Sequence, residues 1–241
     1  MLAVMVVEIR KLNRSLALLL ALAAPGLIGV FNFFNMLRIG EPKPWDMWLG
    51  TALGVWAFFM LPMSVTALTA LIAHMEHGSK AWEHLRALPV PRWRLYAAKA
   101  ICVLGVVALM SVLTLAFTWA AVSLAALVNP SVAPLGAPEW GKTLAAIGRV
   151  GLAAILMIAV QFWVSLRFQS FVPGLALGIG GTFFAVVATA ARPGVFLPWQ
   201  MPVNTLMGEA ARQQTALGLG CGLGLVVLAL ATAHLSRREV L

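Results

Sequence analysis

The chain has 241 residues, of which 61% are hydrophobic and 10% are charged. That apolar share is far above the share typical of soluble domains, and it excludes an ordinary water-soluble core. The formal net charge of +9 would suggest a nucleic-acid partner in a soluble protein. Here the basic residues flank apolar runs, so membrane topology accounts for them and no nucleic-acid partner is expected. Cys102 and Cys221 lie inside apolar runs, which indicates small apolar fillers rather than a disulfide.

The N-terminal residues predict a helix that lies in the membrane interface. Apolar residues recur at spacings of three and four along one helical face: Leu2, Met5, Ile9, Leu12 and Leu16. A cleavable signal peptide is the alternative, because basic residues precede an apolar stretch with Ala21 and Ala23. The apolar run continues to Phe34 and Glu8 sits among the basic residues, so we interpret this stretch as an uncleaved first span.

Six apolar runs are long enough to cross a bilayer, which takes about 20 helical residues. They cover residues 16–37, 48–73, 95–128, 143–166, 172–190 and 215–235. The sequence therefore predicts an all-α integral membrane protein, in which residues 1–241 form a single transmembrane domain. Pro25 and Pro62 fall within spans, where a missing amide hydrogen kinks a helix.

The distribution of Lys and Arg sets the expected orientation. Ten of them lie in one set of segments between the runs: Arg10, Lys11, Arg14, Lys80, Arg86, Arg92, Arg94, Arg167, Arg237 and Arg238. The alternate segments hold five: Arg38, Lys43, Lys142, Arg192 and Arg212. Basic residues collect on the cytoplasmic side, so both termini and the segment between the second and third runs are expected in the cytoplasm. Lys99 indicates that the start of the third run lies at the interface.

A charged insert between the second and third runs predicts a short amphipathic helix over about residues 79–88. Ser79 is a suitable N-cap, Trp82 and Leu85 share one face, and Pro89 ends the helix. From the residues alone, two interpretations remain open: a turn that rests on lipid headgroups, and a docking surface for a soluble partner.

The order of several residues in the chain resembles the permease subunits of type 2 ABC exporters. Around the insert these residues are Glu76, Gly78, Trp82, Leu88-Pro89, Arg92 and Lys99. A second set is similar to the lantibiotic-immunity and bacitracin-resistance branch of that family. It consists of Gln161-Phe-Trp-Val-Ser165-Leu-Arg-Phe168, then Gly174 and Gly178, then Leu197-Pro198-Trp199-Gln-Met-Pro202. The resemblance covers essentially the whole chain, and the ordered set carries it because the individual motifs are loose.

The resemblance implies an ATP-driven exporter in the inner membrane of a bacterium. Two permeases, identical or homologous, would face each other among membrane lipids, each served by a cytoplasmic ABC ATPase that binds ATP and magnesium. The implied ATPase-coupling surface is Glu76, Gly78, Trp82, Leu85, Leu88, Pro89 and Arg92. The expected substrate is an amphipathic peptide antibiotic or a lipid-linked compound, and haem or a small drug is the alternative within the family.

Catalytic and metal sites are not expected in this chain. Residues 136–143 satisfy the phosphate-binding pattern G-x-x-x-x-G-K-[ST]. Pro130 and Pro134 exclude the buried strand that must precede such a loop, so we interpret the match as a coincidence. ATP hydrolysis is therefore expected on a separate chain. The histidines near Glu76 are interpreted as interfacial polar residues, since a metal site needs three or four converging ligands.

Polar residues within the runs are the candidates for a transport path: Asn32, Asn35, Ser64, Thr66, Thr69, Gln161 and Ser165. In hydrocarbon such groups must find partners, so we expect them to face the bundle or a cavity. Hydrogen bonding between neighbouring helices is the simpler alternative. Arg149 lies about two turns into the fourth run, and we prefer a position at the outer headgroups to one in a cavity wall.

Glycines in the last two runs predict close helix packing. They are Gly174 and Gly178, then Gly218, Gly220, Gly222 and Gly224. Packing within one subunit is the preferred interpretation, and a seam between permeases is the alternative. The aromatic, proline-rich residues 196–202 are expected to re-enter the outer interface.

Two functions from other classes compete with the exporter. An ion-gradient-driven secondary transporter would place acidic residues inside the spans, and none of the eight falls at a span centre. A non-transporting membrane anchor or sensor is the third hypothesis.

Overall fold

The computed structural model describes all residues except 1, 14, 79–90, 190 and 238–241. Its α-helices are α1 (Leu2–Asn13), α2 (Leu16–Ile39), α3 (Trp45–Val55), α4 (Leu61–Gly78), α6 (Arg92–Val128), α7 (Trp140–Ala153), α8 (Ile155–Arg167), α9 (Val172–Ala188), α10 (Met201–Asn204), α11 (Ala210–Leu217) and α12 (Gly224–Arg237). Two π-helical segments join them, η1 (Trp56–Met60) and η4 (Gly218–Leu223), and two 3-10 turns, η2 (Pro130–Val132) and η3 (Arg192–Phe196). The described residues form no β-strand, which confirms the all-α prediction.

Each of the six predicted runs coincides with helical structure. Among the described residues, four continuous stretches are long and apolar enough to cross a membrane: Leu16–Ile39, Trp45–Met75, Arg92–Val128 and Ala210–Arg237. Helices α7 and α8 form a fifth if they are taken as one span, bent by 40° at their junction. Helix α9 is apolar but has 17 residues, fewer than the about 20 that a perpendicular crossing takes. The chain is therefore a multi-pass helical protein with four or five spans by length.

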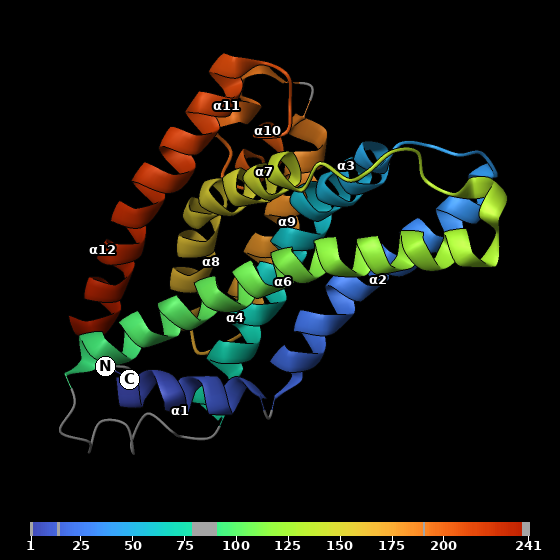
Figure 1. Ribbon diagram of the computed structural model, residues 1–241. Coiled ribbons are helices and arrows are strands. Elements are labelled where there is room, and N and C mark those ends of the chain that lie inside the picture. Colours follow the sequence, from blue (N-terminus) through green and yellow to red (C-terminus); the bar gives the residue numbers. More distant parts are fainter. Residues whose placement is uncertain (1, 14, 79–90, 190, 238–241) are drawn as a thin grey trace.

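The helices pack lengthwise into one bundle (Figure 1). Helix α2 runs along α6, α12 packs on α8, and α4 packs on both α8 and α9. Helix α1 lies across one end of the bundle, where it contacts α6. We call this end the α1 end; both chain termini are drawn there, while α10 and α11 lie at the opposite end (Figure 1).

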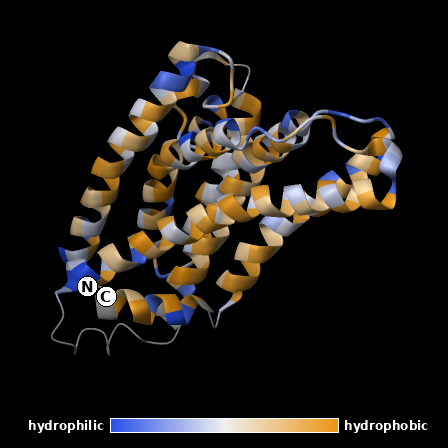
Figure 2. Ribbon diagram, in the orientation of Figure 1, coloured by the Kyte–Doolittle hydropathy of each residue, from blue (hydrophilic) through white to orange (hydrophobic). Residues whose placement is uncertain are grey.

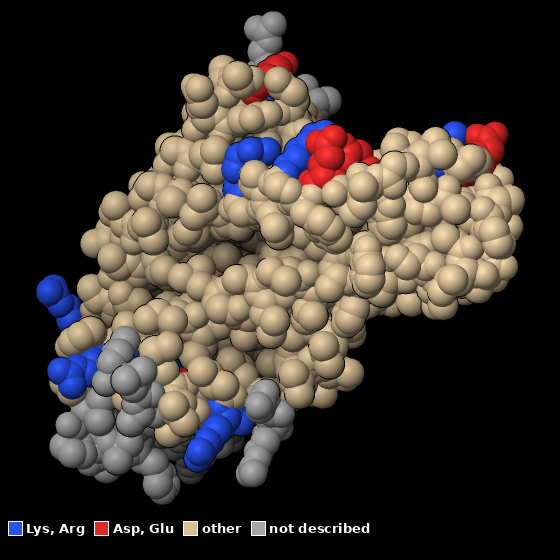
Figure 3. All heavy atoms as spheres, in the orientation of Figure 1, with Lys and Arg blue, Asp and Glu red and all other residues tan. Residues whose placement is uncertain are grey.

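The outer surface of the bundle is apolar between its two ends. Large apolar side chains point outward from α2, α6, α9 and α12, among them Leu27, Phe34, Leu127, Phe184, Val187 and Leu230. Orange, hydrophobic segments follow the helices and blue segments gather near their ends (Figure 2). In Figure 3 the charged residues of the drawn face also lie near the ends, with an uncharged band between them. A soluble monomer rarely exposes so large an apolar surface, so this band is the surface that faces lipid.

The second long stretch changes its winding where it passes Pro62. Proline has no amide hydrogen, so the regular hydrogen bonding of an α-helix is interrupted there. The chain forms the π-helical segment η1 just before this residue. Trp56 in η1 is fully buried, and its Nε1 donates to Ser111 Oγ of α6 at 3.1 Å. The irregular segment is thus held by a side-chain hydrogen bond to a neighbouring helix.

Two glycines allow the last helix to cross the α7–α8 junction at backbone contact. A Cβ atom on Gly220 would overlap the carbonyl oxygen of Ala153, and one on Gly224 would lie 2.6 Å from the backbone nitrogen of Leu156. Gly222, in the same segment, has open space around the corresponding position. Small residues let backbones approach closely in membranes. These contacts confirm packing within one subunit for Gly220 and Gly224, and leave Gly218 and Gly222 without such a contact among the described residues.

Candidate functional site

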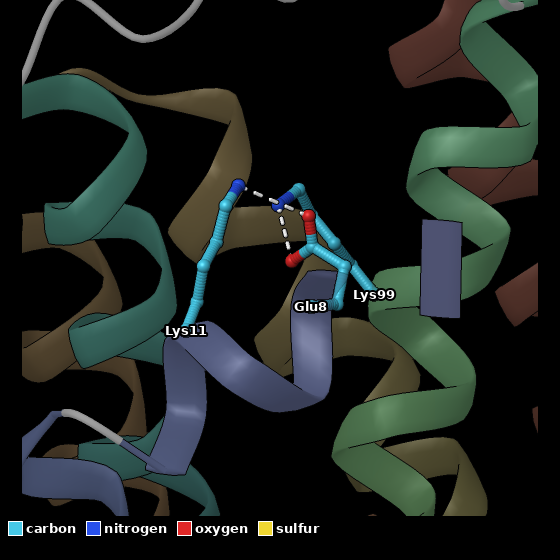
Figure 4. Close-up of polar contacts among 3 residues, drawn as sticks. All are labelled: Glu8, Lys11 and Lys99. Carbon is cyan, nitrogen blue, oxygen red and sulfur yellow. Dashed lines mark hydrogen bonds and ion pairs between the residues drawn. The ribbon is translucent and has the colours of Figure 1, made fainter. Parts of the chain in front are cut away.

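An ion pair ties α1 to α6 at the α1 end (Figure 4). Lys99 Nζ lies 2.7 Å from Glu8 Oε2, and Lys11 Nζ lies 3.1 Å from Glu8 Oε1. Lys99 is 1% exposed and Glu8 is 6% exposed. The sequence analysis expected the start of the third run at the interface, and the structure shows in addition that α1 covers the Lys99 side chain. The pair joins positions 91 residues apart, which no local pattern reveals.

The apolar face predicted for α1 lines a groove beside this ion pair. Met5, Ile9 and Leu12 of α1 face residues of α2 and α6, including Ala21 and Leu109, around a volume of ≈ 290 Å³. The helix therefore combines an apolar contact with a charged one. Both fix its position on the end of the bundle.

The predicted ATPase-coupling surface lies only partly within the described residues. Glu76 and Gly78 form the end of α4, and Arg92 is the exposed first residue of α6. The predicted helix over residues 79–88 lies outside the described residues, and so do Trp82, Leu85, Leu88 and Pro89. The end of α4 and the start of α6 both lie at the α1 end (Figure 1). The coupling surface thus stays a prediction, with its two flanking helix ends in place.

Four of the seven candidate path residues meet in one seam, which we call the polar seam. It consists of Thr66 and Thr69 of α4, Gln161 and Ser165 of α8, and the glycines of α9 that face them. Ser165 Oγ donates to Thr69 Oγ1 at 3.1 Å, and Gln161 Nε2 donates to the carbonyl of Gly174 at 2.6 Å. All four side chains are buried. Gln161 and Ser165 thus hydrogen-bond to neighbouring helices, whereas the Thr66 hydroxyl donates to the carbonyl of Pro62 within α4.

The other candidate path residues lie apart from this set of hydrogen bonds. Asn32 is fully buried in α2 and donates to the carbonyl of Ile28 at 2.9 Å. Asn35 accepts from Arg38 near the end of α2, at 3.4 Å. Ser64 is buried in α4. Thus the structure brings together the residues of α4, α8 and α9, and it does not bring Asn35 to them.

Replacing Gln161 by leucine is expected to cost about 1–3 kcal/mol of unfolding free energy, because the carbonyl of Gly174 then loses a buried donor. Thr69→Val removes a hydroxyl that accepts from Ser165 Oγ and donates to carbonyls within its own helix. Between helices it removes one neutral hydrogen bond, so it is the smaller change, expected to cost about 0.6 kcal/mol. Unfolding by sodium dodecyl sulfate in mixed micelles, followed by circular dichroism, measures both. Equal effects of the two variants would contradict the seam as described.

The segment between α9 and α11 folds into the bundle. Trp199 is nearly buried and packs where Gly181 of α9 leaves room for its ring. Gln200 is 1% exposed and donates from Nε2 to Thr189 Oγ1 at 3.0 Å. The sequence analysis expected this segment at the outer interface and did not single out Gln200 or Asn204 as buried. Hydropathy alone does not show that a short polar segment turns inward.

A pocket lies at the end of the bundle opposite α1. Asp46 of α3, Lys142 and Arg149 of α7, Thr205 after α10 and Gln213 of α11 line it, together with apolar neighbours. Its volume is ≈ 290 Å³. Lys142 Nζ lies 2.8 Å from Asp46 Oδ2 at an exposed position. Arg149 therefore lines a pocket, which is the alternative that the sequence analysis did not prefer.

The phosphate-loop pattern at residues 136–143 lacks its structural context. The residues ahead of it form the 3-10 turn η2 and a short loop instead of a strand, and α7 begins at Trp140. The lysine of the pattern, Lys142, pairs with Asp46. This confirms that the match is a coincidence.

Comparison with known proteins identifies the family. A family model described as ABC-2 family transporter protein matches residues 4–186, from α1 into α9. The match covers more than half of the chain, so this protein belongs to the ABC-2 family of transporter proteins. No curated protein and no solved structure matches it. Together with the lipid-facing helices, family membership defines a multi-pass permease subunit of an ABC transporter, a class of subunit that works with ABC ATPase subunits.

Proposed function

We propose that this chain is the permease of an ATP-driven exporter that moves an amphipathic peptide antibiotic or a lipid-linked compound. The observation that carries the proposal is the family match over residues 4–186. The order of residues that resembles the lantibiotic-immunity and bacitracin-resistance branch supports this substrate class. Haem or a small drug would be the cargo of a sibling branch.

The proposed topology has six spans, with α9 as the fifth. Helix α9 packs lengthwise on α4 and α8, although it is shorter than the other spans. The start of α1 and the end of α12 both lie at the α1 end, which is consistent with an even number of crossings (Figure 1). The excess of Lys and Arg at this end supports a bacterial inner-membrane protein whose α1 end faces the cytoplasm.

The proposed mechanism couples a separate ATPase to the α1 end. ATP and magnesium bind the ATPase, whose closure pushes on a coupling helix at residues 79–88. That segment joins α4 to α6, so a push there acts on both helices. The Glu8–Lys99 ion pair makes α1 move with α6. The motion of α4 then reaches α8 and α9 through the polar seam, and a second permease completes the path.

A gradient-driven transporter is the less supported function. Such a protein needs titratable acids within the membrane. In the described part of the chain, Glu8 lies on α1 and Asp46 and Glu139 lie near the opposite end. These positions suit the ends of a bundle better than the middle of an ion path.

The test is a mild-detergent pull-down from native membranes, with bound proteins identified by mass spectrometry. The variant Trp82→Ala, Leu85→Asp removes the proposed contact. Trp140→Ala, Leu135→Asp makes the same two changes at exposed positions near the opposite end of the bundle. Wild type and the Trp140 variant are expected to retain an ABC ATPase, and the Trp82 variant is expected to lose it at least tenfold.

Two outcomes would count against the proposal. Loss of the ATPase from the Trp140 variant alone would mean that the ATPase binds the end of the bundle opposite α1. Absence of any ATPase from folded wild type would remove the ATP-driven mechanism and favour a gradient-driven transporter.

A further inference from the structure

We infer that the pocket between α3, α7 and α11 binds a phosphate group, and that Arg149 holds it. The inference concerns a site at the end of the bundle opposite the proposed ATPase contact, so it goes beyond the proposed function and does not depend on it. Lipid headgroups and free phosphate present the same chemistry to this pocket. The experiment below separates these two sources.

One face of α7 forms a wall of the pocket. Lys142, Ala146 and Arg149 all line it, at helical spacings of four and three residues. Lys142 is exposed at the mouth, with its ammonium on Asp46. Arg149 lies seven residues further along α7, which is about 10 Å along the axis at the rise of an α-helix. Arg149 is partly buried, so the pocket has an exposed ion pair and a second, partly buried cation in the same wall.

The inner cation lacks a counter-charge. Lys142 already has two acids, Asp46 at 2.8 Å and Glu139 at 3.8 Å. Within the part of the chain that the structure describes, Arg149 has no ion pair and no hydrogen-bond acceptor, and its Nε is buried without a partner. Buried donors are almost always satisfied, by protein, water or a ligand. An anion in the pocket would satisfy this one.

Arginine suits anions that present two neighbouring oxygens, as phosphate does. Its planar guanidinium donates two parallel hydrogen bonds to neighbouring oxygens of phosphate or carboxylate. In surroundings of low dielectric constant the attraction between the ions is much stronger than in water. A free guanidinium inside a protein pocket is therefore a suitable phosphate ligand.

The rest of the wall suits an amphiphile. Leu49, Leu53 and Leu206 line the pocket beside the charged residues. Thr205 also lines it, and the preceding Asn204 is fully buried with both amide atoms unpartnered among the described residues. The Asn204 amide is a further unsatisfied donor close in sequence to the pocket wall. Apolar side chains next to a free cation match a lipid whose phosphate lies beside its acyl chains.

The experiment measures how a ligand shields one wall of the pocket from a thiol reagent. Ala146→Cys is made in a Cys102→Ala, Cys221→Ala background, and its alkylation rate with a maleimide is measured in dodecyl maltoside micelles. The probes are dioleoylphosphatidylglycerol, dioleoylglycerol, which has no phosphate, and inorganic phosphate. Arg149→Gln tests the proposed ligand. Arg38→Gln removes an exposed arginine of α2 that does not line the pocket.

Phosphatidylglycerol is expected to slow alkylation, and dioleoylglycerol is not. The concentration for half-protection is expected to rise about 10–100-fold in Arg149→Gln, as the loss of a charged hydrogen bond predicts. Arg38→Gln leaves it unchanged. Asp46→Asn removes the acid at the mouth and is expected to lower the concentration for half-protection. Equal alkylation rates without ligand show that the variants keep the pocket.

Protection by phosphatidylglycerol alone identifies a lipid headgroup site, and protection by inorganic phosphate as well identifies a site for the free anion. Either result supports the inference if Arg149→Gln raises the concentration for half-protection about 10–100-fold. Equal protection by dioleoylglycerol overturns the inference, and so does protection that Arg149→Gln leaves unchanged or the absence of protection by both phosphate probes. The assay involves no ATPase, so these outcomes leave the proposed export function to its own test.

Discussion

Replacing Lys99 by methionine is expected to lower the unfolding free energy by about 3–5 kcal/mol, because it leaves the Glu8 carboxylate in a buried position without one of its two ammonium partners. Glu8→Leu combined with Lys99→Met removes both members of the pair. Since the desolvation cost of the ions also disappears, the double variant is expected to recover most of the loss. Unfolding in mixed micelles measures the three variants of this double-mutant cycle.

Lys142→Met provides the matched control for this prediction. Lys142 also pairs with a carboxylate, that of Asp46 at 2.8 Å, but the lysine side chain is 68% exposed. Exposed ion pairs contribute about 0–1 kcal/mol, so this variant is expected to change stability little. If Lys99→Met has no larger effect than Lys142→Met, α1 does not cover Lys99 as the structure shows.

Gly220→Ala is expected to destabilise the protein by about 1–3 kcal/mol, because the added methyl group meets the backbone of Ala153, which cannot rotate away. Gly222→Ala is the matched change two residues further along, where a Cβ atom has open space. At that position alanine restricts the unfolded chain more than glycine does, and we expect a gain of about 0.5–1 kcal/mol. The two variants should therefore shift the midpoint of unfolding in opposite directions.

Mixed-micelle unfolding of both glycine variants measures this difference. A stabilising effect at Gly220 would mean that α12 and its π-helical segment do not cross the α7–α8 junction at backbone contact. A loss of stability in Gly222→Ala would indicate that a second subunit or another helix packs against Gly222, since the described part of the chain leaves that position open.

The positions of the long apolar helical stretches were largely predictable, whereas the six predicted spans compare with four or five by length among the described residues. Apolar runs longer than about 20 residues specify membrane helices because lipid cannot hydrogen-bond to an exposed backbone. The α2 and α6 limits agree with the predicted runs to within a few residues. The break between α7 and α8 was not predicted. It falls at Ala154, in a stretch without proline, where Gly220 and Gly224 approach the backbone on either side of the break.

Residues of the candidate site were predictable only where the residue type itself shows that a buried partner is needed; the partner itself was not predictable. Thr69 and Ser165 were selected because polar groups in a membrane need partners, and the structure pairs them. Arg149 was recognised as costly in lipid, but its place in a pocket depends on α3 and α11, which are distant in sequence. Gln200 and Asn204 lie in a segment that is buried because it folds against α9, and this burial is visible only in the tertiary structure.

The sequence by itself determined that this protein is an all-α membrane protein, where its helices lie and which family it resembles, because hydrophobic length and local motifs are properties of short stretches of chain. Only the tertiary structure decided which side chains meet. The Glu8–Lys99 pair, the polar seam and the pocket at Arg149 each join helices that are far apart in sequence. Hydropathy fixes how deep a residue lies in the membrane, but not which neighbour it faces, since that depends on how the helices rotate and cross when they pack.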